Sequence, residues 1–324
     1  MSTPRFTLKV GAAPASAILL ALVAAACTGG GDEGDSSVIT PSTEGAQVTA
    51  LVVNSELVVG ENRFMIGLLS AENEEITGAQ VGFRFFKLEG EEQEPRGEAE
   101  ATPIALEKSY TEIHEDGTVE THSAGESGVY VATVQFDEAG TWAVEITASA
   151  DGTPYGPIGT AFSVLDEAST IAVGAPAPRS ETLTLDDVAD VAEIDTSDPP
   201  IPEMHTMTIA EAVTSGRPSV IVFATPAYCV SRICGPTKDV VDDLFQQYGD
   251  RVNFVHVEPY DVPRVRRGEC PNLGACAVSA AVEWGLPSEP WVFLVDADGN
   301  VAAKFEAVVT LDQLKQALES LLTG

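Results

Sequence analysis

The sequence predicts a multidomain chain, in which an N-terminal all-β sandwich is followed by a C-terminal α/β domain. Residues 46–165 contain short runs of alternating apolar and polar side chains, with turn residues about every ten positions. Residues 208–324 instead combine short β-branched runs with apolar side chains at helical spacing. With 324 residues, the chain is long enough for two domains that each bury a core.

Residues 1–27 have the composition of a secretory signal. Arg5 and Lys9 give a positively charged start, and an apolar run from Val10 to Ala26 follows. This run is short for a retained transmembrane helix, which needs about 20 residues. Residues 28–45 are rich in glycine, serine, threonine and acidic residues, which is typical of a disordered tether.

The signal ends in Leu22-Val-Ala-Ala-Ala-Cys27, which resembles the lipobox of bacterial lipoproteins. The resemblance implies that Cys27 carries a lipid anchor, and that the protein is bacterial, extracytoplasmic and held at the cell membrane. The alternative is an ordinary cleaved signal in which Cys27 is incidental. The net charge of −33 argues against nucleic acid as a partner, because the phosphate backbone is also anionic.

Six runs in residues 46–165 are predicted strands, and the acidic run 89–100 between them is a predicted loop. His114 and His122 lack the tight spacing of metal ligands, so we expect both to be solvated loop histidines and predict no metal site. The predicted strands are Val48–Asn54, Gly60–Leu69, Ala79–Leu88, Gly128–Phe136, Gly140–Ser149 and Thr160–Leu165.

The hairpin predicted from residues 128–134 and 139–146 carries an aromatic residue on each arm. Together with residues 59–68, it resembles the small immunoglobulin-like modules of extracytoplasmic bacterial proteins, of the YtkA-like type. The resemblance implies an immunoglobulin-like sandwich over residues 46–165, which we expect to space or dock the following domain. Residues 166–207 have linker composition, and we expect Met204 and His205 on the solvent side of the next helix.

The C-terminal part, residues 208–324, is predicted to alternate strands and helices. Its first strand is followed after a loop by a helix, and then by a second strand, which is the pattern of a right-handed parallel unit. In order, we predict a helix 208–216, a strand 220–224, a helix from 235, a strand 251–258, a helix 277–284, a hairpin 291–306 and a helix 311–322.

Two cysteines, Cys229 and Cys234, lie in the loop between the first of these strands and its helix. Cys234 stands where the helix begins, and the partial positive charge of a helix N-terminus favours a thiolate. We therefore predict that Cys234 is a reactive nucleophile and that Cys229 is the thiol that resolves its adducts. No cofactor is required for this chemistry.

Three local matches in this part resemble the thioredoxin-like fold. Cys234-Gly-Pro-Thr237 stands where thioredoxins have Cys-Gly-Pro-Cys, and Pro290 stands where that family has its cis-proline. The turn 296–299 and the last helix resemble the TlpA-like, redoxin-type branch. The resemblance implies thiol–disulfide exchange with protein thiols and disulfides, with Pro290 beside the docking edge. Thr237 replaces the usual resolving cysteine, which leaves Cys229 for that role.

Cys270 and Cys276 form a second close pair, which we expect to be a structural disulfide that pins an irregular loop. A redox relay is the alternative, and the sequence leaves open whether the two pairs form within themselves or with each other.

Two other functions also remain open. The loop of Cys229 and Cys234 resembles that of Sco-type copper chaperones, which implies a copper site with His256 or Met204 as a third ligand. The other alternative is a non-catalytic surface protein in which both cysteine pairs are permanent disulfides.

Overall fold

The structure is a computed structural model that describes residues 48–90, 92–114 and 118–323. The predicted signal segment, the lipidation site Cys27 and the tether 28–45 lie outside the described residues. All described residues belong to one unit of the chain, from Ile39 to Gly324. Among them, no helix is both long enough and apolar enough to cross a membrane.

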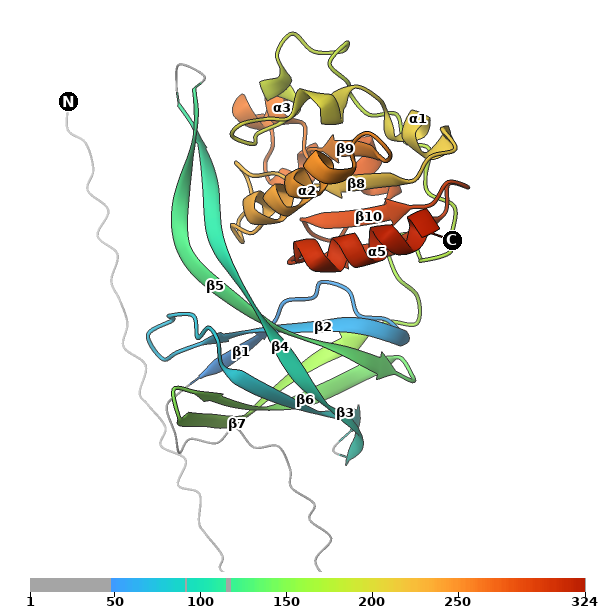
Figure 1. Cartoon of the computed structure of the whole chain (residues 1–324). Helices are drawn as coiled ribbons and strands as arrows, with labels where there is room; N and C mark the ends of the chain where they lie inside the picture. Colours follow the sequence, from blue (N-terminus) through green and yellow to red (C-terminus); the bar gives the residue numbers. More distant parts are fainter. Residues whose placement is uncertain (1–47, 91, 115–117, 324) are drawn as a thin grey trace, which may run out of the picture. The chain divides into compact units, whose positions relative to one another are not determined.

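The first half of the chain forms one antiparallel sheet of seven strands (Figure 1). Its strand order is β1-β2-β5-β4-β3-β6-β7, and β1 and β7 stand at its two edges. Just beyond those edge strands, Val59 N–H donates to Leu165 O at 2.9 Å, so the sheet is nearly closed. The strands are β1 (Thr49–Val52), β2 (Gly60–Leu69), β3 (Gln80–Glu89), β4 (Glu92–Ile113), β5 (Val119–Phe136), β6 (Gly140–Ala150) and β7 (Thr153–Val164).

The core of this sheet consists of aromatic side chains. Phe64 makes edge-to-face contacts with Phe83 and Phe85, with ring centroids 5.4 Å and 5.2 Å apart. Phe136 packs against Trp142 at 4.9 Å, and all of these rings are at most 2% exposed. Such pairs add stability beyond the burial of their area, by about 0.5–1.5 kcal/mol each.

The predicted immunoglobulin-like sandwich is therefore wrong, because the strands form one curved sheet rather than two packed sheets. The sequence analysis also placed a loop at 89–100, where the structure has the first half of β4, which is 22 residues long. The acidic side chains of this strand are exposed, so its apolar content is low. Backbone pairing of residues 92–101 with β3 holds this part of β4 in place, while residues 102–113 pair with β5, and such pairing does not depend on apolar side chains.

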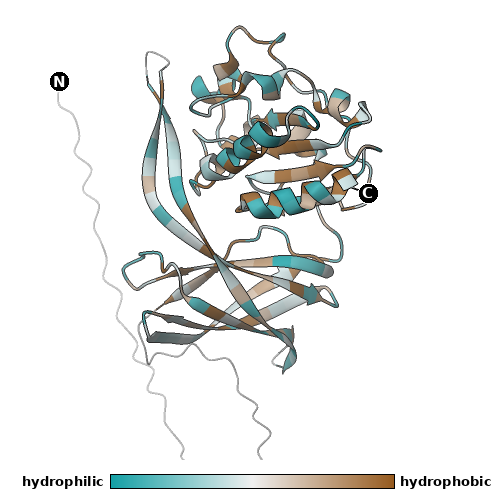
Figure 2. Cartoon of the chain, in the orientation of Figure 1, coloured by the Kyte–Doolittle hydropathy of each residue, from teal (hydrophilic) through white to brown (hydrophobic). Residues whose placement is uncertain are grey.

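The second half of the chain is built around a mixed sheet of four strands, in the order β11-β10-β8-β9. β8 and β9 are parallel, whereas β10 is antiparallel to both β8 and β11. Figure 2 shows the strongly apolar character of β8 and β10. The strands are β8 (Ser219–Phe223), β9 (Asn253–Val257), β10 (Trp291–Val295) and β11 (Val301–Glu306).

Successive residues of β8 enter two different cores, as the alternation of a strand requires. Val220 and Val222 share one core with the apolar faces of the two long helices, α2 (Cys234–Tyr248) and α5 (Leu311–Thr323). Ile221 and Phe223 share the other core with Trp284 and with the short helix α1 (Ile209–Thr214).

The predicted α/β thioredoxin-like class for residues 208–324 is also wrong. Among the described residues, 42% are in strands and 20% in helices, and the C-terminal part is not a clear fold of that class. Besides α1, the short helices are α3 (Val262–Arg266) and α4 (Ser279–Glu283), with five residues each. Helices this short cover little of a sheet. Connector residues such as Ile171, Ala177 and Met207 instead complete the core that contains Trp284.

The connector carries buried polar residues into the second half of the chain. Two single 3₁₀ turns, Val191–Glu193 and Pro202–His205, lie in it, and Asp195 between them is 1% exposed. Met204 and His205 are at most 1% exposed, so the expected solvent-side position of these two residues is wrong. A third 3₁₀ turn, Leu273–Cys276, lies farther along the chain.

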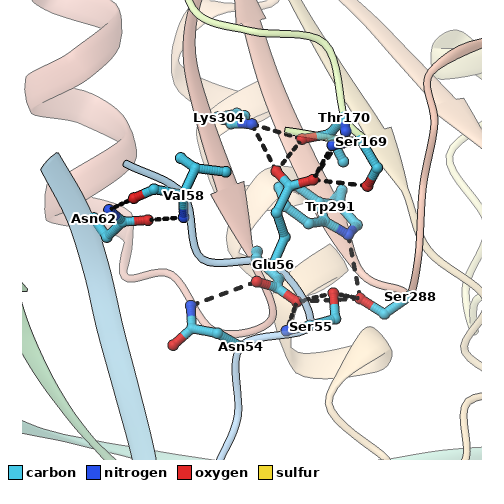
Figure 3. Close-up of polar contacts among 11 residues, drawn as sticks. Asn54, Ser55, Glu56, Val58, Asn62, Ser169, Thr170, Ser288, Trp291 and Lys304 are labelled. Carbon is cyan, nitrogen blue, oxygen red and sulfur yellow. Dashed lines mark hydrogen bonds and ion pairs between the residues drawn. The ribbon is translucent and has the colours of Figure 1, made fainter. Parts of the chain in front are cut away.

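A buried carboxylate, Glu56, links the first sheet to the second (Figure 3). Its oxygens accept hydrogen bonds from the backbone N–H and hydroxyl groups of Ser169 and Thr170, and from Lys304 Nζ on β11 at 3.0 Å. Burial by itself raises the pKa of Glu56, but these donors outweigh it and lower the pKa to about 2. Glu56 is therefore a carboxylate at neutral pH.

A second carboxylate, Glu306, makes the reciprocal contact from the end of β11. It accepts the backbone N–H of Ser55 at 2.6 Å and the hydroxyl of Ser288 at 3.2 Å (Figure 3). Ser288 directly precedes Glu289 and Pro290 in the sequence. This joint therefore fixes the first sheet next to the segment that contains Pro290.

Candidate thiol site

Cys229 and Cys234 meet at the N-terminus of α2. Cys234 is the first residue of this 15-residue helix, and its backbone N–H donates to Cys229 Sγ at 3.3 Å. The hydroxyl of Ser231 lies 3.2 Å from the same sulfur. Both cysteines are free thiols, and Cys229 is 7% exposed whereas Cys234 is fully buried. The structure therefore brings the two predicted thiols together as neighbours.

The N-cap position of α2 explains why the sulfur of Cys229 lies at the start of this helix. The first N–H groups of a helix have no partner within the helix, and a capping side chain normally accepts one of them. Ile233 occupies the N-cap position of α2 and has no side-chain oxygen or nitrogen to do so. Cys229 Sγ takes this role, and a negative charge on it is stabilised by the helix dipole.

The surroundings give the two thiols different pKa values. The Cys234 thiol donates to Cys229 and, against the effect of burial, lowers the pKa of Cys229 to about 6, with help from Ser231 and backbone N–H groups. Burial raises the pKa of Cys234 well above its usual value, and the neighbouring Cys229 raises it further. Cys229 is therefore the thiolate at neutral pH, and Cys234 is a thiol. The sequence analysis had assigned the nucleophile to Cys234.

Glu289 completes the site, and sequence reasoning missed it. One of its carboxylate oxygens lies with the two sulfurs in a group whose atoms are all within 4.8 Å of one another. The Tyr260 hydroxyl donates to Glu289 at 2.6 Å. Burial raises the pKa of Glu289, Tyr260 lowers it, and the charge of Cys229 raises it again. The only signal in the sequence was its position directly before Pro290.

Pro290 directly follows Glu289 in the sequence and is buried. The Glu289–Pro290 peptide bond is cis, and Pro290 O accepts the N–H of Ala307 at 2.9 Å. Glu289 also lines a pocket of about 150 Å³, together with residues that include Tyr260, Ala277 and Ser288. Ligand pockets for drug-sized molecules span about 300–1,000 Å³, so this one fits a single side chain.

Strand β4 covers the thiol loop from the first sheet. Ser109 N–H donates to Arg232 O at 3.3 Å, and Thr111 N–H lies 3.5 Å from Pro226 O. The Arg232 guanidinium stands 4.9 Å above the Tyr110 ring. A Cβ placed on Gly235 would lie 2.6 Å from Ser109 Oγ, so any larger residue here would displace the Ser109 side chain.

The other residues singled out in the sequence lie apart from the two thiols. His114 pairs with Glu120, and His122, which lies within β5, pairs with Glu112 at 3.2 Å and stacks on Tyr110. Cys270 and Cys276 form a disulfide with a Cα–Cα distance of 5.7 Å.

The two residues considered as third copper ligands also have other surroundings. His256 is buried and donates from Nε2 to Ala224 O at 3.0 Å, with its Nδ1 facing Asp195. Met204 packs in the apolar core that also contains Cys229 and Cys234. The third polar group beside the thiols is therefore Glu289 rather than His256.

Comparison with protein families finds no family model that matches this chain, and comparison with curated proteins finds no match either.

Proposed function

We propose that this protein carries out thiol–disulfide exchange with protein thiols and disulfides, with Cys229 as the nucleophile. The observation that carries the proposal is the position of Cys229 Sγ, which accepts hydrogen bonds from the thiol of Cys234, from Ser231 and from the first N–H of α2, so that the pKa of Cys229 is lowered to about 6 beside a second free thiol. A thiolate is the attacking species in disulfide exchange, and its rate is highest when the pKa lies near the ambient pH.

In the proposed reaction, the Cys229 thiolate attacks one sulfur of a partner disulfide. A bond forms between Cys229 and that sulfur, the partner's S–S bond breaks, and the other partner sulfur leaves as a thiolate. Cys234 then loses its proton and attacks Cys229 Sγ. The Cys229–Cys234 disulfide forms, the mixed disulfide breaks, and the partner is released with two reduced sulfurs. The same steps run in reverse when the partner is a dithiol.

We assign to Glu289 the role of the base that removes the proton from the thiol of Cys234. One oxygen of its carboxylate lies within 4.8 Å of both sulfurs, and the carboxylate is oriented by the hydroxyl of Tyr260. A thiol with a raised pKa reacts only after a base has removed its proton, so the second step needs such a neighbour.

We further propose that the reaction takes place outside the cytoplasmic membrane. The support is the signal-like sequence 1–26 and Cys27 in a lipobox-like context, together with a disulfide between Cys270 and Cys276. Disulfides persist in oxidising compartments and are rare in the cytosol.

The test is to trap the mixed disulfide. Replacing the resolving thiol, in Cys234→Ser, should leave an adduct between Cys229 and a disulfide-bonded model protein, visible on a non-reducing gel. Cys229→Ser should form no adduct. An adduct that forms only in Cys229→Ser would show that Cys234 is the nucleophile. The absence of an adduct in both variants would refute the proposed thiol–disulfide exchange.

No observation favours the copper function more than thiol exchange. Cu(I) prefers soft ligands such as thiolates and thioethers, whereas the third ligand beside these thiols is a hard carboxylate. The non-catalytic alternative is less well supported than exchange, because Cys229 and Cys234 are free thiols with different pKa values.

A further inference from the structure

A second buried cluster of polar side chains lies outside the thiol site and is not used in thiol exchange. Asp195 and His205 come from the connector, His205 from its 3₁₀ turn 202–205, and His256 comes from β9. Their side chains are at most 1% exposed. The connector and β9 therefore place two imidazoles and one carboxylate at a single buried point.

The three facing atoms are arranged like metal ligands. His205 Nε2 lies 3.0 Å and His256 Nδ1 lies 3.4 Å from the same oxygen, Asp195 Oδ2, and all three atoms lie within 4.8 Å of one another. Ligands bound to Zn²⁺ at 2.0–2.1 Å with tetrahedral angles stand about 3.4 Å apart. Three such ligands occupy three corners of a tetrahedron and leave the fourth for a water molecule.

The atoms behind the ligands orient them as expected around a metal. His256 Nε2 faces the carbonyl oxygen of Ala224 at 3.0 Å, so it must carry the proton, and the lone pair of a neutral ring then belongs to Nδ1. The other oxygen of Asp195 accepts the backbone N–H of Ser197 at 2.8 Å. Histidine ligands almost always donate their second N–H to a carbonyl or a carboxylate in this way.

The charged side chains near the cluster do not exclude a bound cation. Lys238 is the buried cation next to the cluster, and Asp242 neutralises it through an ion pair at 2.5 Å. The nearby carboxyl of Glu258 is bound by the N–H and hydroxyl of Thr196.

We propose that Asp195, His205 and His256 form a binding site for a divalent cation of the zinc class. Imidazole and carboxylate together suit Zn²⁺, and such a site at the carbonyl of Ala224 would brace the chain where β8 ends and the thiol loop begins. This site is separate from the thiols and does not depend on thiol exchange.

The test measures zinc bound to the purified full chain after dialysis against excess Zn²⁺ and gel filtration. We expect one zinc per chain in the wild type and in the double variant Cys229→Ser/Cys234→Ser. We expect less than a tenth of that amount in His205→Ala and His256→Ala. The matched controls are His114→Ala and His122→Ala, which remove the two half-exposed histidines and should keep the zinc.

A spectroscopic measurement keeps the test decisive if the buried variants do not fold. Co²⁺ added to the wild type in place of zinc should give weak visible bands from nitrogen and oxygen ligands, unchanged in the cysteine double variant. Zinc that binds the wild type but is lost from the cysteine double variant would assign the metal to the thiol site and overturn the proposal. A wild type that retains no zinc, or His variants that retain all of it, would overturn it as well.

Discussion

Cys229 Sγ lies 3.3 Å from the backbone nitrogen of Cys234, at the point where α2 begins. This contact gives the sulfur of Cys229 the place that a capping oxygen normally takes at a helix N-terminus. Together with the hydrogen bond from the Cys234 thiol, it lowers the pKa of Cys229 to about 6, whereas burial raises the pKa of Cys234 well above its usual value. A free cysteine titrates at about 8.5, so this division of roles can be measured as a function of pH.

Alkylation of Cys229 should therefore reach half of its maximal rate near pH 6. Thiolates react and thiols do not, so the rate should rise through pH 6 and be almost constant from pH 7 to 8. Mass spectrometry after brief exposure to iodoacetamide would report the modified residue. Cys234→Ala removes the largest cause of the low pKa and should move the midpoint up, whereas Ser231→Ala should move it less. A wild-type midpoint near pH 8.5 would contradict the assignment of the thiolate.

Glu289→Gln should slow the resolution of the mixed disulfide more than its formation. General bases typically contribute about 100-fold or more, so we expect the second step to slow by at least that factor. Quenched-flow mixing with a disulfide-bonded model protein would separate the two steps. The exposed Glu61 on β2 provides a matched control, since Glu61→Gln should change neither step. Equal slowing of both steps would instead indicate a change in the nucleophile.

The strands were largely predictable from the sequence, whereas their arrangement was not. β2 has the bounds that the alternating pattern predicted, because one of its faces is buried and the other is partly exposed. The pattern does not show which strands pair, and it missed the acidic β4, whose pairing depends on backbone groups. The strands therefore form one nearly closed sheet where a sandwich was expected.

The thiol site was predictable only in part, because its contacts also form only in the folded chain. A cysteine at a helix start is visible in the sequence, but burial and the direction of the Cys234 N–H decide which thiol is charged. Glu289 and Tyr260 come from separate loops and meet only in the folded chain. His205 was noted, but no local pattern indicated its contact with Asp195.

Gly235→Ala should be energetically coupled to Ser109→Ala. Alanine within a helix is usually more stable than glycine by about 1 kcal/mol, but a Cβ here would lie 2.6 Å from Ser109 Oγ. We expect Gly235→Ala to destabilise the wild type and to stabilise the Ser109→Ala background. Urea unfolding of all four proteins gives the coupling energy, which should be about 0.5–3 kcal/mol for residues in contact. A coupling near zero would show that β4 does not approach α2 in solution.

Glu56→Gln should destabilise the fold at neutral pH, and this effect should fade in acid. The folded-state pKa of Glu56 is about 2, below its ordinary value of 4.5. Its charge therefore contributes stability above pH 4.5, and this contribution is lost as the pH falls from 4.5 toward 2. Hydrogen bonds to a charged group contribute about 1.5–3 kcal/mol, so a loss of that order is expected at pH 7.

The measurement for Glu56 is urea unfolding of the wild type and the variant at pH 7, 5 and 3. The difference in free energy of unfolding should be largest at pH 7 and similar at pH 5, because both lie above the unfolded-state pKa. It should shrink at pH 3, where the unfolded chain is protonated but the folded carboxylate still resists protonation. Glu61→Gln, on the exposed side of β2, should show no such trend. A difference that grows in acid would mean that Glu56 is protonated in the folded protein, and that burial outweighs the donors from Ser169, Thr170 and Lys304.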